Sequence, residues 1–160
     1  MRNEAHKCQQ TVIVVCRASG VFVLAMTSRA WETMLLPIEP TLTAPDGSDV
    51  RVLPATARGS CAHFELAGGQ TSLAVVHRTV EEIWFFLGGR GEMWRSAGDG
   101  DPGTTVEVTA DVCITIPVGT RFQFQANGSE PLRAVGVTMP PWPGEDEAVV
   151  VDGPWAPTIG

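Results

Sequence analysis

The sequence has few basic residues, no tyrosine and no closely spaced cysteines. The shortage of basic residues and the cysteine spacing each argue against a class of protein. Eighteen Asp and Glu against eleven Lys and Arg give a formal net charge of −7. A surface of that sign repels phosphate backbones and anionic lipid, so neither nucleic acid nor a membrane surface is an expected partner. The four cysteines, Cys8, Cys16, Cys61 and Cys113, show no C-x-x-C spacing, which argues against a thiolate zinc site. We interpret them as small buried apolar residues in a protein of a reducing, cytoplasmic compartment.

The first thirty residues are left out of the fold prediction. The stretch "TVIVVCRASGVFVLAM" is apolar, but Arg17 interrupts it, and it is shorter than the roughly 20 residues of a membrane-spanning helix. Three interpretations stay open: a cleaved secretion signal, a short membrane anchor, or a dispensable extension whose protein truly starts at Met26 or Met34. At 160 residues the chain suffices for one domain. We predict an N-terminal extension over 1–30, a single domain over 35–151 and a C-terminal tail over 152–160.

The rest of the sequence is a regular series of short apolar runs. Runs of four to seven apolar or β-branched residues alternate with Asp-Gly, Gly-Gly, Gly-Asp-Gly or Pro-x-Gly, which are typical of tight turns. Short strands at this spacing predict an all-β sandwich or barrel. Gly89 and Gly91 are expected at a turn where a Cβ does not fit. The expected strands are 50–53, 62–66, 72–77, 83–87, 93–95, 105–108, 112–116, 121–125, 132–139 and 148–151.

The C-terminal part, "TMPPWPGEDEAVVVDGPWAPTIG", differs in character from these strands. Its prolines at 140, 141 and 143 exclude pairing within a central strand, while Trp142 and Trp155 favour burial. We therefore predict that this segment wraps around the domain. The acidic run "GEDE", 144–147, is interpreted as a solvated turn.

Two segments resemble the conserved motifs of the cupin superfamily. "GQTSLAVVHRTVEEIWFFLGGRG" is similar to the first motif, in which a glycine is followed by H-x-H, a glutamate and an apolar strand that closes on glycine. "PVGTRFQFQANGSEPLRAV" is similar to the second, in which P-x-G-x-x-H opens a strand. The resemblance, over 69–137, implies a single-domain double-stranded β-helix, or jelly-roll barrel. It also implies a homodimer, since pairing between subunits covers exposed strand edges.

Metal-dependent cupins hold a divalent ion with three histidines and one glutamate, and this sequence departs from that set. The resemblance places His77 on the first histidine and Glu82 on the glutamate, but Thr79 on the second histidine and Phe122 on the third. A hydroxyl is a weak metal donor and a phenylalanine ring donates nothing. We therefore expect no cofactor. A divalent metal ion is kept as an alternative, with ligands His77, Glu82 and His63, the last from the strand just upstream.

Strand alternation predicts the remaining side chains of the barrel interior. If Glu82 faces inward, Trp84 and Phe86 do so too, and Ile83 and Phe85 lie on the opposite face. In "RFQFQ", Phe122 and Phe124 share a face, opposite Arg121, Gln123 and Gln125. Aromatic walls with a few polar groups are typical of a small-molecule pocket, and also of an ordinary core. The residues predicted to contact a ligand are Thr79, Trp84, Phe86, Phe122 and Phe124.

Three further residues are assigned to the same pocket. Trp94 and Trp142 are placed at its mouth, and Met139 on its wall.

Two classes of function stay open from the sequence. The first is a small-molecule binding protein without metal chemistry, in which His77, Thr79 and Glu82 orient the ligand. The second is an enzyme, either an isomerase or epimerase with His77 and Glu82 as acid and base, or a metal-dependent oxygenase or lyase with a non-standard ligand set. The pair can also be a relic, hydrogen-bonded within itself and to Thr79. Burial disfavours a lone charge on His77 or Glu82, while their proximity favours an ion pair. The sequence does not identify the ligand, since fold does not imply function.

Overall fold

The computed structural model describes residues 31–159, and from Glu32 onward these form one compact unit. The predictions for the first thirty residues, Cys8 and Cys16 included, lie outside this range. The described part contains one short 3₁₀ helix, η1 (Glu145–Glu147), and no helix in it is long and apolar enough to cross a bilayer. Its strands are β1 (Leu42–Thr43), β2 (Asp49–Val52), β3 (Ser60–Leu66), β4 (Ala74–His77), β5 (Glu81–Gly88), β6 (Arg90–Ser96), β7 (Thr104–Thr109), β8 (Cys113–Ile116), β9 (Arg121–Ala126), β10 (Leu132–Met139) and β11 (Ala148–Val151).

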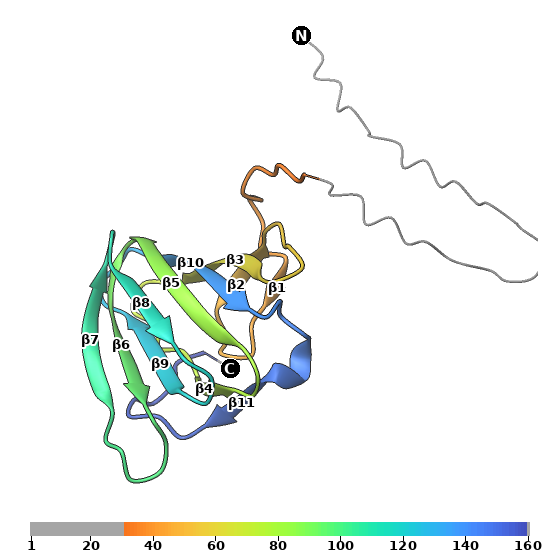
Figure 1. The fold of residues 1–160 in the computed structure, drawn as a ribbon. Helices are drawn as coiled ribbons and strands as arrows, with labels where there is room; N and C mark the ends of the chain where they lie inside the picture. Colours follow the sequence, from red (N-terminus) through yellow and green to blue (C-terminus); the bar gives the residue numbers. More distant parts are fainter. Residues whose placement is uncertain (1–30, 160) are drawn as a thin grey trace, which may run out of the picture. The chain divides into compact units, whose positions relative to one another are not determined.

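The strands form two antiparallel sheets (Figure 1). The first has the order β1-β2-β3-β10-β5-β8 and the second β11-β4-β9-β6-β7. Neighbours in a sheet are often distant in sequence, as β10 is from both β3 and β5. The all-β prediction is confirmed, and all ten predicted strands are present, with bounds that differ by three residues at most. Only β1, which is two residues long, was not predicted.

The alternation predicted for β5 is confirmed residue by residue. Glu82, Trp84 and Phe86 are buried between the sheets, whereas Ile83 and Phe85 lie on the outer face and are 40% and 43% exposed. The inward side chains of β5 meet those of β9 and other strands in one apolar core. The core therefore sits between the two sheets, as binary patterning requires.

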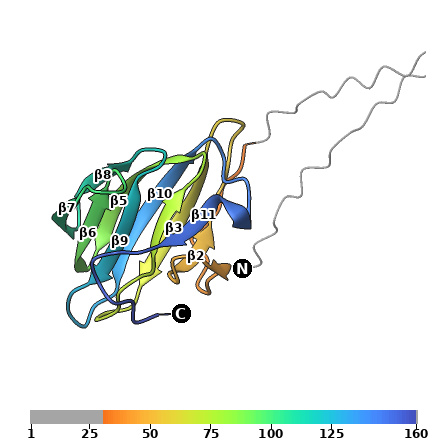
Figure 2. The same cartoon turned by 90° about the horizontal axis from the view of Figure 1, so that it is seen from below.

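In β9 the predicted faces are also confirmed, but both are buried at the middle of the strand. Phe122 and Phe124 point into the core, and Gln123 on the other side is only 1% exposed. Its amide nitrogen donates to the carbonyls of Ser72 (2.8 Å) and Trp155 (2.9 Å), and its oxygen accepts the N–H of Trp155 (3.1 Å). Gln123 is buried because the segment after β11, dark blue in Figure 2, packs back over this strand.

Gly89, between β5 and β6, and Gly91, within β6, both lie where a Cβ does not fit, as predicted, but only Gly89 is at the turn. Gly89 has a φ of +77°, and a Cβ on it would overlap the carbonyl oxygen of Pro131. A Cβ on Gly91 would overlap the carbonyl oxygen of Gln125 in the paired strand β9. Both positions admit only glycine without a backbone shift.

Candidate functional site

A cavity of about 360 Å³ is enclosed by residues of both sheets. Its walls are mainly apolar, with Val50 and Val52 from β2, Ala62 and Phe64 from β3, and Val75 from β4 among them. The ionisable groups among the described residues that line it are Asp46, Cys61, His77 and Glu82, and no lysine or arginine is among them. The cavity is therefore an apolar space with a few acidic and neutral polar groups.

Glu82 projects into this cavity from β5 and is 2% exposed. Its Oε2 accepts a hydrogen bond of 2.7 Å from the indole Nε1 of Trp84, two residues along the same strand face. Burial raises the pKa of Glu82 to about 8, although the Trp84 bond acts in the opposite direction, and the nearby carboxyls of Asp46 and Glu147 raise it further. At neutral pH the carboxyl of Glu82 therefore carries its proton.

His77, at the end of β4, faces Glu82 without forming the ion pair that proximity favours. Its Nδ1 lies 3.9 Å from Oε2 of Glu82 and is buried with no hydrogen-bond partner among the described residues. The imidazole meets Phe122 and Trp142 edge to face, with ring centroids 5.1 Å away in each case. Burial lowers the pKa of His77 to about 4, against the pull of the Glu147 carboxylate. Burial thus outweighs proximity, and both members of the pair are neutral at pH 7.

Thr79 does not line the cavity, contrary to the prediction that it contacts a ligand. It is exposed, and its hydroxyl and N–H donate to the carboxylate of Glu147 at 2.8 and 2.6 Å. The N–H of Val80 donates to the same carboxylate at 2.8 Å. Glu147 thereby holds the turn between β4 and β5, which carries His77 at one end and leads to Glu82 at the other. Within residues 31–159 Thr79 makes no hydrogen bond to either of them, so the hydrogen bonds predicted for the relic alternative are not formed.

The prediction that "GEDE" is a solvated turn is right for Glu145 and Asp146 and wrong for Glu147, which is only 4% exposed. Burial acts to raise the pKa of Glu147, but hydrogen bonds from the backbone N–H groups of Thr79 and Val80 hold it below its ordinary value. No local pattern distinguishes Glu147 from its acidic neighbours. The signal lies far away in the sequence, in a turn with two N–H groups that need an acceptor.

Asp46 lines the cavity, and the sequence did not reveal it. It is 5% exposed, and its Oδ1 accepts hydrogen bonds from the N–H (2.8 Å) and hydroxyl (2.6 Å) of Ser48. Burial raises the pKa of Asp46, and the two Ser48 bonds oppose the rise. The Asp-Gly pair at 46–47 does form a turn, with a φ of +88° at Gly47. Turn chemistry accounts for the backbone but does not show that the carboxyl borders a cavity.

The aromatic residues predicted for the pocket divide into two groups. Trp84, Phe122 and Trp142 line the cavity, together with Phe64, whose ring stacks on Trp84 at a centroid distance of 4.5 Å. The others lie elsewhere: Phe86 and Phe124 are fully buried in the core behind it, the indole N–H of Trp94 donates to the carbonyl of Pro102 at 3.0 Å, and Met139 is not a wall residue. Alternation predicted the inward face correctly, but not which inward residues border empty space.

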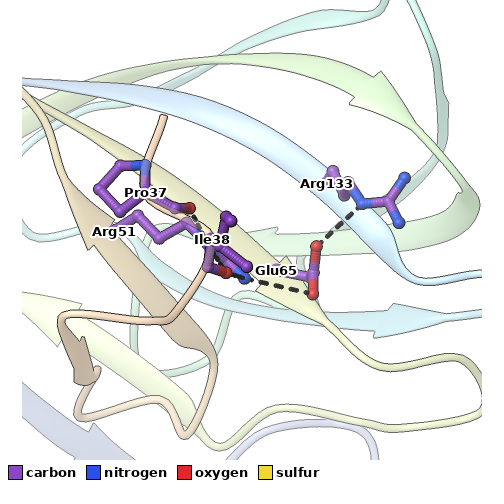
Figure 3. Close-up of polar contacts among 5 residues, drawn as sticks. All are labelled: Pro37, Ile38, Arg51, Glu65 and Arg133. Carbon is purple, nitrogen blue, oxygen red and sulfur yellow. Dashed lines mark hydrogen bonds and ion pairs between the residues drawn. The ribbon is translucent and has the colours of Figure 1, made fainter. Parts of the chain in front are cut away.

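His63 lies on the opposite face of the sheet and is no candidate for the cavity. Ala62 and Phe64 line the cavity, so His63 between them points away, beside Arg51 in the register of β2 and β3. This outer face holds a polar cluster, shown in Figure 3. The guanidinium of Arg51 donates to the carbonyls of Pro37 and Ile38 at 3.0 to 3.2 Å, and Glu65 accepts from Arg133 at 2.8 Å and lies 3.9 Å from Arg51.

The donor set does not fit the metal that metal-dependent cupins bind. Of the four ligand positions only His77 and Glu82 present donors to the cavity, since Thr79 is bonded to Glu147 and Phe122 has no donor atom. Within residues 31–159 no three His, Cys, Asp or Glu side chains are grouped so that they could hold a metal ion. A catalytic metal ordinarily needs three protein ligands.

Comparison with solved structures shows the fold. BH2720 from Bacillus halodurans aligns with a TM-score of 0.55 and 21% identity, over 63% of this chain and 75% of its own. The cupin domain of Schizosaccharomyces pombe Cnp3 gives 0.52 and 16%, over 58% of this chain and 61% of its own. Oxalate decarboxylase from Bacillus subtilis, a protein described with Mn(II) centres, gives 0.59 and 18%, over 71% of this chain but only 29 to 30% of its own.

No family model and no curated protein matches this sequence. The structural neighbours include cupin proteins, so the described part of the chain has a cupin fold, as the two motifs led us to expect. At these identities the neighbours carry the architecture alone.

Proposed function

We propose that this cupin-fold chain binds a small, mainly apolar molecule in the cavity between its sheets, with His77 and Glu82 as the polar groups that orient it. The observation that carries the proposal is the cavity itself. Its volume of about 360 Å³ and its apolar walls with few convergent polar groups match small-molecule sites, which span roughly 300–1,000 Å³. The neighbours do not decide between binding and catalysis, because they include both a decarboxylase and a domain named only for its fold.

A mutation that fills the cavity tests this proposal. Ala62 lines the cavity on β3, so Ala62→Phe places a ring in that space, whereas Ala110→Phe makes the same change at an exposed turn residue. Compounds that raise the melting temperature of the wild type in a thermal-shift screen should also stabilise Ala110→Phe and should not stabilise Ala62→Phe. Circular dichroism would establish that both variants are folded. Equal stabilisation of the two variants would place the binding outside the cavity and contradict the proposal.

Acid–base catalysis is a second candidate, favoured by the opposite pKa shifts of two facing groups. Glu82, with its pKa raised to about 8, retains a proton to donate, and His77, with its pKa lowered to about 4, has a free nitrogen lone pair. Such a separation of pKa values is what assigns acid and base roles at many active sites. In one step the imidazole would take a proton from the substrate while the Glu82 carboxyl gives one to another substrate atom.

Deuterium exchange distinguishes this second candidate from binding alone. Each compound found in the thermal-shift screen would be incubated with the protein in D₂O, and its C–H signals followed by proton NMR. Catalysis predicts loss of a signal with the wild type, and no loss with His77→Gln or Glu82→Gln. Retention of all signals with the wild type would leave the binding function alone.

A further inference from the structure

We propose that the molecule bound in the cavity is a small organic cation of the alkylammonium class and not an anion. This inference rests on the proposed binding function and adds the chemical class of the ligand. It follows from three features of the wall: the sign of its ionisable groups, its aromatic rings, and its unsatisfied hydrogen-bonding atom.

The ionisable side chains at the cavity wall include carboxyl groups that can become negative, and none of those described is positive at neutral pH. Its two carboxyl groups, Asp46 and Glu82, are 5% and 2% exposed, and no lysine or arginine of the described chain lines the wall. A third carboxyl, Glu147, is near enough to act electrostatically on both His77 and Glu82. An anion that entered this space would lose its hydration and find no positive partner on the described wall, and such a desolvation costs several kcal/mol or more. A cation loses hydration too, but its charge lowers the pKa of a carboxyl that it meets, so Glu82, which is protonated in the free protein, can release its proton and pair with the cation.

The aromatic rings favour the same sign of charge. Phe64, Trp84, Phe122 and Trp142 all line the cavity, and the faces of such rings attract cations by their quadrupole. Trp84 lies beside Glu82, to which its indole N–H is bonded at 2.7 Å. A carboxyl group beside aromatic rings suits an ammonium ion with an apolar substituent, because the substituent packs on the rings while the charged head meets the acid.

One buried polar atom of the described wall, the Nδ1 of His77, has no hydrogen-bond partner, and an ammonium group can supply a donor to it. The Nδ1 of His77 is buried without a hydrogen-bond partner among the described residues, 3.9 Å from Oε2 of Glu82. An ammonium group has three N–H donors and no acceptor. One donor directed at the imidazole and one at the Glu82 carboxyl would satisfy both groups. A carboxylate ligand has no hydrogen to donate to the imidazole.

The test compares three probes that share a seven-carbon skeleton and differ in charge: benzylamine, benzyl alcohol and benzoate. Their affinities would be measured by calorimetry at neutral pH and about 0.15 M salt, where long-range attraction by the net charge is screened. A hydrogen bond between charged groups leads us to expect that benzylamine binds about tenfold more tightly than benzyl alcohol, and benzoate most weakly. In Glu82→Gln the advantage of benzylamine over benzyl alcohol should disappear. Glu145→Gln, the same change at an exposed residue, should behave as the wild type.

The outcomes separate the ligand class from the function. If benzyl alcohol or benzoate binds the wild type as tightly as benzylamine, the cation inference is wrong and the binding function stands. If benzylamine keeps its affinity in Ala62→Phe or in Glu82→Gln, its binding does not involve the cavity carboxyl, and the inference is likewise overturned. If none of the three binds the wild type, the proposed binding function is contradicted as well.

Discussion

Replacing Glu82 by glutamine should change the way in which the stability of the protein depends on pH. The folded-state pKa of Glu82 is about 8 and its ordinary value is 4.5. Between these values the folded state holds a proton that the unfolded state has released, so stability falls as pH rises. Linkage gives a slope of about 1.4 kcal/mol per pH unit for one such group. Glutamine cannot titrate, and Glu82→Gln should therefore lack this part of the slope.

The pKa of His77 is shifted in the opposite direction, and this narrows the pH range over which the stability of the wild type falls. Its folded-state pKa is about 4 against an ordinary 6.5. Between those values the unfolded state holds the extra proton, so the contribution of His77 to stability rises with pH. The two contributions oppose each other between pH 4.5 and 6.5, and only that of Glu82 remains between pH 6.5 and 8. Over those 1.5 pH units it removes about 2 kcal/mol from the free energy of unfolding.

Urea denaturation at several pH values between 6.5 and 8 measures this loss. The free energy of unfolding of Glu82→Gln, relative to the wild type, should rise by about 2 kcal/mol across that window. His77→Gln should differ from the wild type mainly below pH 6.5, and Glu145→Gln, an exposed carboxyl, should differ at no pH in the range. If Glu82→Gln and the wild type run parallel from pH 6.5 to 8, the carboxyl is ionised in the folded protein and the reasoning is refuted.

Three other features of the molecule can also be tested: the metal-donor set of the cavity, Glu147 and Gly91. Elemental mass spectrometry on protein purified without a metal-affinity tag should find far less than one equivalent of transition metal; a near-stoichiometric metal that is lost in His77→Ala would show that the cavity donors do hold an ion. Glu147→Gln should lower the free energy of unfolding by about 2 kcal/mol at neutral pH, since it weakens three hydrogen bonds to a charged acceptor; this contribution exists above pH 4.5 and is lost as pH falls through the lowered folded-state pKa. Glu145→Gln should lose less than about 0.5 kcal/mol, and an equal loss in both variants contradicts the role of Glu147. Gly91→Ala should lower the free energy of unfolding, measured by urea denaturation, by at least about 2 kcal/mol, because the added Cβ overlaps backbone atoms. Gly88→Ala should cost less, because an added Cβ there would have no atom within 4 Å. Equal losses in the two variants would refute the steric argument.

The fold was open to prediction because its determinants are local and repeated. Alternating apolar residues in β5 and β9 defined one inward face each, Gly89 marked the turn after β5, and Gly91 marked a close strand contact in β6 that excludes a Cβ. Each of these features acts through sterics and burial over a few neighbouring residues, which a sequence displays directly. The strand β1 was missed because two residues are too few to show any period.

Only part of the site was predictable, because a cavity forms where the side chains of several strands leave space unfilled. Strand period and the motif resemblance correctly placed Glu82, Trp84 and Phe122 on the inward face. They did not separate wall residues from the packed core, where Phe124 lies, because that depends on the summed volumes of side chains from several strands. Asp46 was missed for a similar reason, since its turn comes near the cavity only after β2 has paired with β3 and β3 with the distant β10.

The bond between Glu147 and the turn at residues 79–80 has a consequence for biosynthesis. The polar groups of the cavity lie on strands near the middle of the chain, but the side chain that fixes their turn comes from just before β11. The pairing of β3 with β10, and of β4 with β11, likewise joins segments about 70 residues apart. Contacts of such long range make folding slow, and a nascent chain on the ribosome cannot form them until it has been made through β11. An incomplete translation product should therefore have none of the proposed binding activity, and not a fraction of it.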